Sequence, residues 1–168
     1  DNTASEVVSN GYGQLLENSI SVVTCNKIAC SSNYDLYARL KGLAKEHNCS
    51  FKYETSVGAA LPIIKTIYDL NISGDKIHKI EAVISGSFNF ILNEYNGENL
   101  FADVVLKAKE DGYTEPNPLI DLSGLDVMRK ILILSRESGL NKEISDITFN
   151  SFLPDECSDS EDVPTFFN

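Results

Sequence analysis

Residues 20–25 read ISVVTC, a continuous β-branched and apolar run that decides the class of fold. Such a run is typical of a strand buried on both faces of a parallel sheet. The sequence predicts a helix from Asn33, capped by Asn33 or Ser32, with leucines three or four residues apart, and a second strand over residues 50–54. A strand, a helix and a strand in this order predict a parallel β-α-β unit, so we expect residues 1–54 to be part of a doubly wound α/β fold.

The sequence on either side of this unit predicts more helices and one more strand. Residues 5–17 favour a helix, and its GYGQLL segment is not a dinucleotide-binding loop because Leu16 stands where the third glycine belongs. A strand is predicted over residues 77–85, with His78 facing solvent. Further helices are predicted at IIKTIYDL, at SGSFNFIL and at FADVVLKAKED, the last of them ended by Gly112. The N-terminus of the SGSFNFIL helix can hold a carboxylate.

Charge and composition limit the partners. The 168 residues carry 25 acidic and 14 basic side chains, and the net charge of −11 would repel nucleic acid and anionic lipid. Residues 154–168 form an acidic tail that accounts for part of this charge. No apolar run reaches the ~20 residues that cross a bilayer, and the cysteines form no CxxC pair that would indicate zinc. We expect a cytoplasmic protein that binds neither nucleic acid nor membranes, and the start at Asp1 without methionine predicts a piece of a longer chain.

Two short segments after the predicted strands have more than one interpretation. Lys27 follows the first strand, at the edge where open α/β sheets bind ligands, but an ordinary solvated loop lysine is the favoured interpretation on position alone. Residues 54–62, ETSVGAALP, combine a carboxylate with small residues whose carbonyl oxygens can approach one point, as in a cation site. The spacing alone favours a tight turn that leads into a helix with Pro62 in its first turn.

Residues 108–130, AKEDGYTEPNPLIDLSGLDVMRK, concentrate charged residues and chain breakers ahead of an apolar helix. Pro116 and Pro118 hold Glu115 and Asn117, the residues before them, in extended or turn conformations. Ser123 is the predicted N-cap of the helix, with Asp126 at N3. Asp126 and Lys130 are four residues apart, which suits a simple surface ion pair. However, a helix that is apolar nearly all round is expected to be buried, and its charges must then be paired or line a cavity. From the residues alone, both interpretations of the pair stay open.

The same stretch resembles the signature of homoserine dehydrogenases. The resemblance rests on fixed spacings from Ala108 through Gly112-Tyr113-Thr114-Glu115-Pro116 and Asp121-Leu122 to Asp126 and Lys130. It extends to VVTCNK, YETSVGAALPII and ISGSFNFIL, and so covers residues 1–153. The run into DITFNSFLP resembles the dehydrogenase half of bifunctional aspartokinase–homoserine dehydrogenases.

The resemblance implies a fold and an activity. Residues 1–54 would be the C-terminal part of a Rossmann-like dinucleotide-binding domain, and residues 55–153 an α+β substrate and dimerisation domain with a mixed sheet and helices. The activity would be the NAD- or NADP-dependent interconversion of L-homoserine and L-aspartate 4-semialdehyde, in the biosynthesis of threonine and methionine. A homodimer through the sheet of the substrate domain is expected, and a dimerisation or binding module without catalysis is the alternative function.

The resemblance also implies roles for individual residues. Lys130 would exchange a proton with the substrate oxygen, and Lys27 would lie close to both nicotinamide and substrate. Glu115 and Asp126 would bind the substrate, while Gly112 and Glu115 would lie near the cofactor. A sodium site would be formed by the Glu54 carboxylate with three backbone carbonyls, those of Val57, Ala59 and Leu61.

Some features of the family are missing or changed. Ala60 replaces a common glycine of the cation turn (residues 54–62). Ile28, Ser87 and Asn117 replace other common residues without removing a named catalytic group. No G-x-G-x-x-G motif occurs in the 168 residues. The sequence therefore predicts substrate-side chemistry without dehydrogenase activity of this chain alone, and it does not decide between NAD and NADP.

Overall fold

The computed structural model describes residues 1–114 and 117–153, which form two compact units. Unit 1 comprises residues 1–81 and 129–148. Unit 2 comprises residues 82–128 and 149–153 within the described ranges. These units are divided differently from the domains predicted from the sequence, 1–54 and 55–153, and those domain bounds stay a prediction.

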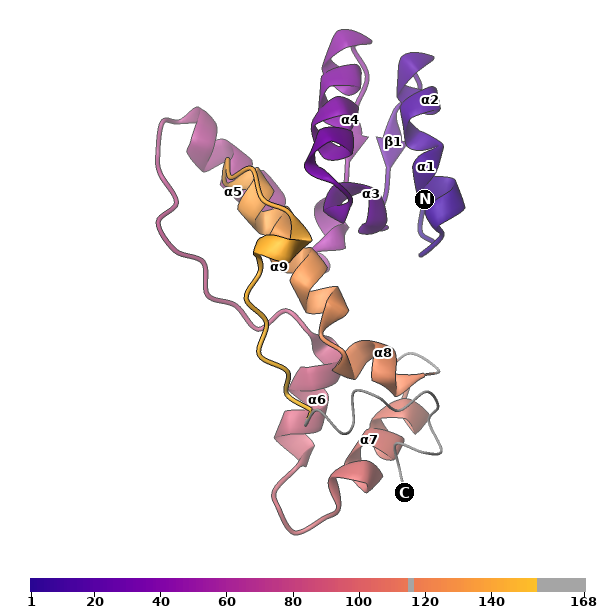
Figure 1. The fold of residues 1–168 in the computed structure, drawn as a ribbon, viewed down its shortest axis with the longest axis vertical. Coiled ribbons are helices and arrows are strands. Elements are labelled where there is room, and N and C mark those ends of the chain that lie inside the picture. Colours follow the sequence, from indigo (N-terminus) through magenta and orange to yellow (C-terminus); the bar gives the residue numbers. More distant parts are fainter. Residues whose placement is uncertain (115–116, 154–168) are drawn as a thin grey trace. The chain divides into compact units, whose positions relative to one another are not determined.

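Unit 1 contains the strands and most of the helices (Figure 1). Its elements are α1 (Glu6–Asn10), α2 (Tyr12–Glu17), β1 (Val22–Val23), α3 (Ile28–Ser31), α4 (Tyr34–Glu46), β2 (Phe51–Lys52), the 3₁₀ turn η1 (Glu54–Ser56), α5 (Ile63–Ile72), α9 (Leu125–Glu137) from Arg129 onward and the 3₁₀ turn η2 (Ile144–Asp146). Unit 2 holds α6 (Gly86–Glu94), α7 (Phe101–Glu110), α8 (Pro118–Leu122) and the first turn of α9.

The two strands confirm the predicted parallel β-α-β unit. β1 pairs with β2 in parallel, with Val22 opposite Phe51, and α4 connects them. The prediction that the first strand is buried on both faces was wrong. Val22 is buried, whereas Val23 is 68% exposed, because α2 and α4 pack together over the face that carries Val22.

Local signals explain where the helices of unit 1 begin and end. The Asn33 side chain accepts a hydrogen bond from the Leu36 backbone N–H at 2.8 Å, which confirms the predicted start of α4. The single helix predicted over residues 5–17 is instead divided at Gly11 into α1 and α2. Tyr12 and Leu16 of α2 and Leu40 of α4 are buried in one cluster with Val22. These contacts fix the helices against β1.

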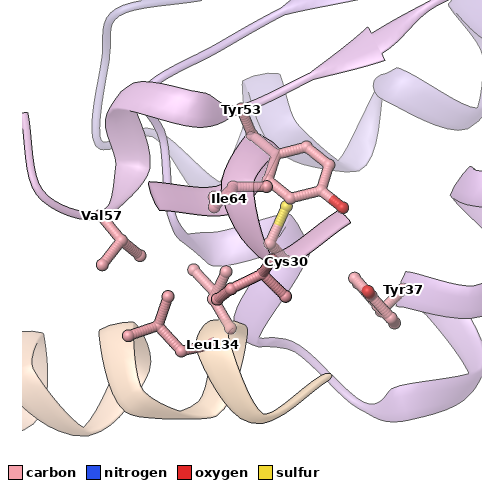
Figure 2. Packing of buried hydrophobic residues seen from close by; sticks show 8 residues of the cluster. Cys30, Tyr37, Tyr53, Val57, Ile64 and Leu134 are labelled. Atoms are coloured by element: carbon pink, nitrogen blue, oxygen red, sulfur yellow. The ribbon is translucent and has the colours of Figure 1, made fainter. Parts of the chain in front are cut away.

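A second cluster joins segments that are distant in the sequence (Figure 2). It gathers Cys30 from α3, Tyr53 from the end of β2 and Leu134 from α9. Its other buried members are Tyr37, Val57, Ile64, Ile67 and Ile133. Burying a side chain of this size stabilises the fold by about 1.5–3 kcal/mol. The second half of α9 therefore belongs to the core of unit 1.

The strand predicted over residues 77–85 is wrong. The described chain there has no regular structure, and the only strands in the described residues are β1 and β2. An alternating pattern needs a neighbouring strand to complete its backbone hydrogen bonds, and none of the described residues provides one. The mixed sheet expected within residues 55–153 is thus not seen in the part that the structure describes. His78 is exposed, as predicted.

Unit 2 is built from short helices around its own core, which includes Ile91 of α6, Val105 of α7 and Leu122 of α8. The Ser85 side chain accepts a hydrogen bond from the Phe88 N–H at 3.2 Å and caps α6. Gly112, at φ +76°, follows the C-cap of α7, as predicted. No helix in the described residues is long and apolar enough to span a membrane.

The start of α9 differs from its prediction. Residues 118–122 form the separate helix α8, in which Ser123 is the C-cap residue. Gly124, at φ +73°, then turns the chain into α9, which begins at Leu125. Asp126 is therefore the second residue of the helix and not its third. The prediction failed because Pro118 read as a stiff spacer, although proline is also favoured in the first turn of a helix.

Candidate functional site

Lys27 occupies the turn between β1 and α3. It is the N-cap residue of α3, with helical backbone angles, and its side chain is half-buried. The preceding Asn26 is buried and fixes this turn: its Oδ1 accepts from the Ile28 N–H at 2.9 Å and its Nδ2 donates to the Ser5 carbonyl at 3.0 Å. The sequence singled out Lys27 but missed Asn26, whose amide can serve both as donor and as acceptor.

Glu54 lies in the turn after β2, where it caps α5. Its two carboxylate oxygens accept from the backbone N–H groups of Ile64 and Lys65, at 2.8 and 2.9 Å. These are orphan donors of the first helical turn, so the negative charge faces the positive end of the helix dipole. The side chain that was predicted to bind a cation therefore also has a structural task in this fold.

The turn that follows Glu54 has an unusual backbone, with two residues in the left-handed region. Gly58 and Ala59 have φ values of +78° and +52°. A Cβ atom on Gly58 would lie 2.1 Å from Ile63 Cδ1, so a side chain there would force Ile63 to move. The oxygen donors, one carboxylate and the carbonyls of Val57, Ala59 and Leu61, have the hard chemistry that suits an alkali-metal ion. The Leu61 carbonyl already accepts from the Ile63 N–H at 2.9 Å.

Lys130 lies on the part of α9 that belongs to unit 1, and its side chain is half-buried. The prediction that α9 is buried nearly all round was too broad. Leu132, Ile133 and Leu134 are buried, whereas the residues from Leu125 to Ile131 are half-buried or exposed. Lys130 thus stands just before the buried stretch of a firmly packed helix. Lys27, Glu54 and Lys130 are all carried by unit 1.

The remaining predicted site residues are not in unit 1. Gly112 ends α7 and is exposed, and Asp126 is half-buried in the first turn of α9, both within unit 2. Glu115 lies outside the described residues. In the first turn of α6, the Ser87 side chain binds a carboxylate: Ser87 Oγ donates to Asp121 Oδ1 at 2.7 Å. Asp121 of the signature therefore joins α8 to α6.

A pocket of about 450 Å³ opens in unit 1 beside the end of β2. Two carboxylates, those of Glu54 and Glu137, lie in its wall together with Lys41, Tyr53 and Tyr68. Neither Lys27 nor Lys130 is among its lining residues. The pocket is therefore not the place where the two predicted catalytic lysines act.

The sequence analysis missed a buried polar cluster around Glu137. The carboxylate accepts hydrogen bonds from the hydroxyls of Tyr37 and Tyr53, both at 2.5 Å, and from Lys41 Nζ at 3.0 Å. Burial, and then the negative charge of Glu137, raise the pKa of both phenols well above the usual range. Both hydroxyls therefore stay protonated at neutral pH and remain donors to the carboxylate. The signal in the sequence was an adjacent Arg-Glu pair directly after the apolar run of residues 131–134.

The fold and these residues define an α/β protein with lysines at the end of a parallel strand and on a packed helix. The family model described as homoserine dehydrogenase matches residues 62–163. The chain therefore belongs to the homoserine dehydrogenase family.

Individual relatives agree with this assignment. The chain is 44% identical over 173 residues to a bifunctional aspartokinase/homoserine dehydrogenase 2 of Zea mays. The aligned region covers 99% of this chain and 19% of the relative. It is 40% identical over 172 residues to a homoserine dehydrogenase of Schizosaccharomyces pombe, with 99% and 46% covered. The chain thus spans less than half the length of these relatives.

Solved structures are similar as well. A protein of unknown function from Candida auris has a TM-score of 0.91 at 32% identity, covering 99% of this chain and 48% of its own. A hyperthermophilic archaeal homoserine dehydrogenase in complex with NADPH has a TM-score of 0.72 at 33% identity, covering 81% and 41%. The α/β class predicted from the sequence is consistent with both.

Proposed function

We propose that this chain carries the substrate-side chemistry of a homoserine dehydrogenase, which interconverts L-homoserine and L-aspartate 4-semialdehyde with NAD or NADP. The observation that carries the proposal is the family signature, which runs from Gly112 to Lys130 inside the matched region and ends on the packed helix α9. The reaction would serve the biosynthesis of threonine and methionine from aspartate.

Lys130 is the proposed acid and base. In the reductive direction its ammonium donates a proton to the aldehyde oxygen while hydride adds to the carbonyl carbon. In the oxidative direction the neutral amine accepts the hydroxyl proton while hydride leaves the same carbon. The cofactor supplies or accepts the hydride when it is bound. A positive charge beside the reacting oxygen also stabilises the negative charge that develops on it.

The other signature residues have binding roles in this proposal. Asp126 and Glu115 hold the ammonium group of the amino-acid substrate, because a carboxylate is the natural partner of that group. Lys27 lies beside the nicotinamide and the substrate at the end of β1, while Gly112 and Glu115 contact the cofactor. A sodium ion would be held by the carboxylate of Glu54 and the carbonyls of Val57, Ala59 and Leu61.

The assembly is part of the proposal too. We expect a cytoplasmic homodimer, although the described part of residues 55–153 contains no strand to which the dimer contact can be assigned. The alternative function is a dimerisation or binding module without catalysis. A monomer whose sedimentation is independent of concentration would count against dimerisation in either case.

The test is an assay of the whole protein with aspartate semialdehyde, in which NADPH oxidation is followed. Substituting Lys130→Ala should lower kcat by about 10²–10⁴-fold, the usual contribution of a general acid or base. The matched control is Lys65→Ala, which removes an exposed lysine that is ion-paired with Asp69 on α5 and should leave kcat unchanged. Equal rates for Lys130→Ala and the wild-type protein would refute the role of Lys130.

The 168 residues alone are a second test. Because no G-x-G-x-x-G loop is present in them, we expect no measurable NADPH oxidation. Activity of the isolated chain that disappears with Lys130→Ala would overturn that expectation and would make this chain sufficient for the reaction.

A further inference from the structure

Two adjacent charged residues at the end of α9, Arg136 and Glu137, are the most deeply buried charges of the described chain. Arg136 is 4% exposed and Glu137 is 7% exposed, and no other charged residue in residues 1–114 and 117–153 is buried. Burying a charge is unfavourable unless it is paired and fully hydrogen-bonded. The contacts of each side chain therefore need an explanation.

Arg136 holds the end of the short helix that starts at Lys27. Its Nη1 donates to the Cys30 carbonyl at 2.8 Å and its Nη2 donates to the Ser32 carbonyl at 2.7 Å. These carbonyls lie at the C-terminus of α3, where the helix leaves its own acceptors without partners. The planar guanidinium satisfies both at once, which a lysine could not do. Lys27, at the other end of this single helical turn, is thereby tied to α9.

The same guanidinium is fixed from a second side. Arg136 Nε donates to the Lys142 carbonyl at 3.0 Å, and Nη2 also meets Glu143 Oε2 at 3.0 Å. Glu143 Oε1 in turn accepts from the Tyr34 N–H at 2.8 Å, in the first turn of α4. The arginine is therefore immobilised, and a shift of α9 would have to break several hydrogen bonds together.

Glu137 holds the end of β2 in the same way. Tyr53 donates to its carboxylate and is the residue directly before Glu54. The Tyr53 ring also packs on Phe51 of β2, with the ring centroids 4.8 Å apart. In addition, the backbone carbonyl of Glu137 accepts from Asn71 Nδ2 of α5 at 2.6 Å. Both neighbours of the cation turn, β2 and α5, are thus bonded to one residue of α9.

Lys130 is on the same face of α9 as Glu137. The two residues are seven positions apart, which is close to two helical turns, and Leu134 lies between them on the same stripe. Figure 2 shows Leu134 beside Cys30 and Tyr53 in the core. The segments of unit 1 that carry Lys27, Glu54 and Lys130 therefore all meet at the last turn of α9.

We infer that Arg136 and Glu137 are positioning residues for the reaction: they fix the backbone that carries Lys130 relative to the backbone that carries Lys27 and Glu54. Both act through other residues and not on the substrate, because their side chains are hydrogen-bonded to α3, to Tyr37 and to Tyr53. This inference rests on the proposed function. Its physical reason is that a displacement of about 1 Å at a reacting group can cost about 10²-fold in rate.

The test uses the whole protein and the variant Arg136→Lys, which keeps the charge but cannot reach both α3 carbonyls. We expect kcat to fall by about tenfold or more, with KM for homoserine changed by less than about threefold, since groups that bind substrate are retained. The matched control is Val105→Ala in the core of unit 2, a cluster that shares no residue with the one that contains Tyr37 and Tyr53. It should lower the melting temperature at least as much and leave kcat within about twofold at a temperature where both variants are folded.

A second measurement does not depend on activity. Hydrogen exchange of the backbone amides in residues 26–32 should become faster in Arg136→Lys, and it should stay unchanged in Val105→Ala, whose core cluster holds no residue of this segment. If the wild-type protein fails to act on homoserine, the proposed function fails, and the exchange experiment still tests the link between α9 and the Lys27 turn. Unchanged exchange in residues 26–32 would overturn the inference. So would a kcat of Arg136→Lys equal to that of the control variant.

Discussion

The two halves of α9 use their charged residues differently. In the first half, Asp126, Arg129 and Lys130 are half-buried. In the second half, Arg136 and Glu137 are buried and hydrogen-bonded to α3, α4 and the end of β2. The signature of the family ends with the first half, at Lys130. The comparison shows that the residues recognised by a motif and the residues that hold them in place occupy neighbouring turns of one helix.

The difference between the two halves is tested most directly by comparing Glu137→Ala with Asp126→Ala. Glu137→Ala leaves the hydroxyls of Tyr37 and Tyr53 without their acceptor, and we expect it to lower the free energy of unfolding by about 3–5 kcal/mol. Asp126→Ala removes a half-buried acid from the first turn of a helix and should cost less than Glu137→Ala, whose carboxylate is buried. Denaturant unfolding measures both, and equal losses would show that the halves do not differ.

Substitutions at the same two residues should change different kinetic constants where the protein still folds. Asp126→Ala is expected to raise KM for homoserine, since the carboxylate is proposed to bind the substrate ammonium. Glu137→Gln, which keeps the size of the side chain, should instead act on kcat. Steady-state assays at a temperature below both unfolding transitions separate these effects. A Glu137→Gln variant whose only change is in KM would contradict a positioning role.

Alkaline pH should lower the free energy of unfolding through the two tyrosines that are bonded to Glu137. Burial, followed by the charge of Glu137, raises the pKa of Tyr37 and Tyr53 in the folded protein, whereas an unfolded tyrosine has a pKa of about 10. Above that pH the unfolded chain loses protons that the folded protein keeps. The free energy of unfolding should thus be unaffected by these groups below about pH 10 and fall by about 1.4 kcal/mol per pH unit for each of them above it.

The measurement is urea unfolding between about pH 9 and pH 11. Tyr53→Phe removes one of the two titrating groups and should give a shallower decrease. The control is Ile67→Val in the same core, which should lower stability by about 0.5–1.5 kcal/mol at every pH and keep the wild-type slope. An identical slope in Tyr53→Phe would show that its phenol does not contribute.

The glycines that flank α9 give the smallest expected difference. Gly124, before the helix, and Gly139, after it, have φ values of +73° and +91°. Alanine is strained by about 1–2 kcal/mol in such a conformation at either site. At Gly124 the new Cβ would also lie 2.4 Å from the Phe149 ring, whereas at Gly139 nothing lies within 4 Å. Thermal unfolding should therefore show a larger loss for Gly124→Ala, and a larger loss for Gly139→Ala would contradict the described packing.

Local signals in the sequence predicted much of the fold. The parallel β-α-β unit, the Asn33 cap of α4 and the position of Gly112 all depend on neighbouring residues, and all agree with the structure. The predicted strand over residues 77–85 failed because alternation describes a strand's faces but does not provide its partner. Helix α8 was missed because it has only 5 residues, too few for a periodic pattern.

The candidate site was predictable only where the signature names its residues. Lys130, Lys27, Asp126, Gly112 and Glu54 were found by spacing and resemblance. Asn26, Arg136 and Glu137 were missed because their importance depends on contacts with distant parts of the chain. The bond between Tyr37 and Glu137 joins residues separated by 100 positions. Local sequence patterns carry no information on such a pair.

The seven-residue interval between Lys130 and Glu137 has a consequence for how this helix can change. An α-helix advances by about 100° and 1.5 Å per residue. A single inserted residue between the two positions would leave Glu137 at its tyrosines only if Lys130 turned to a different side of the helix. A change of one whole turn would restore the direction of Lys130 but move it by about 5.4 Å. The number of residues in this interval therefore sets both the distance and the relative direction of the two side chains, so the helix tolerates substitutions there but not insertions or deletions.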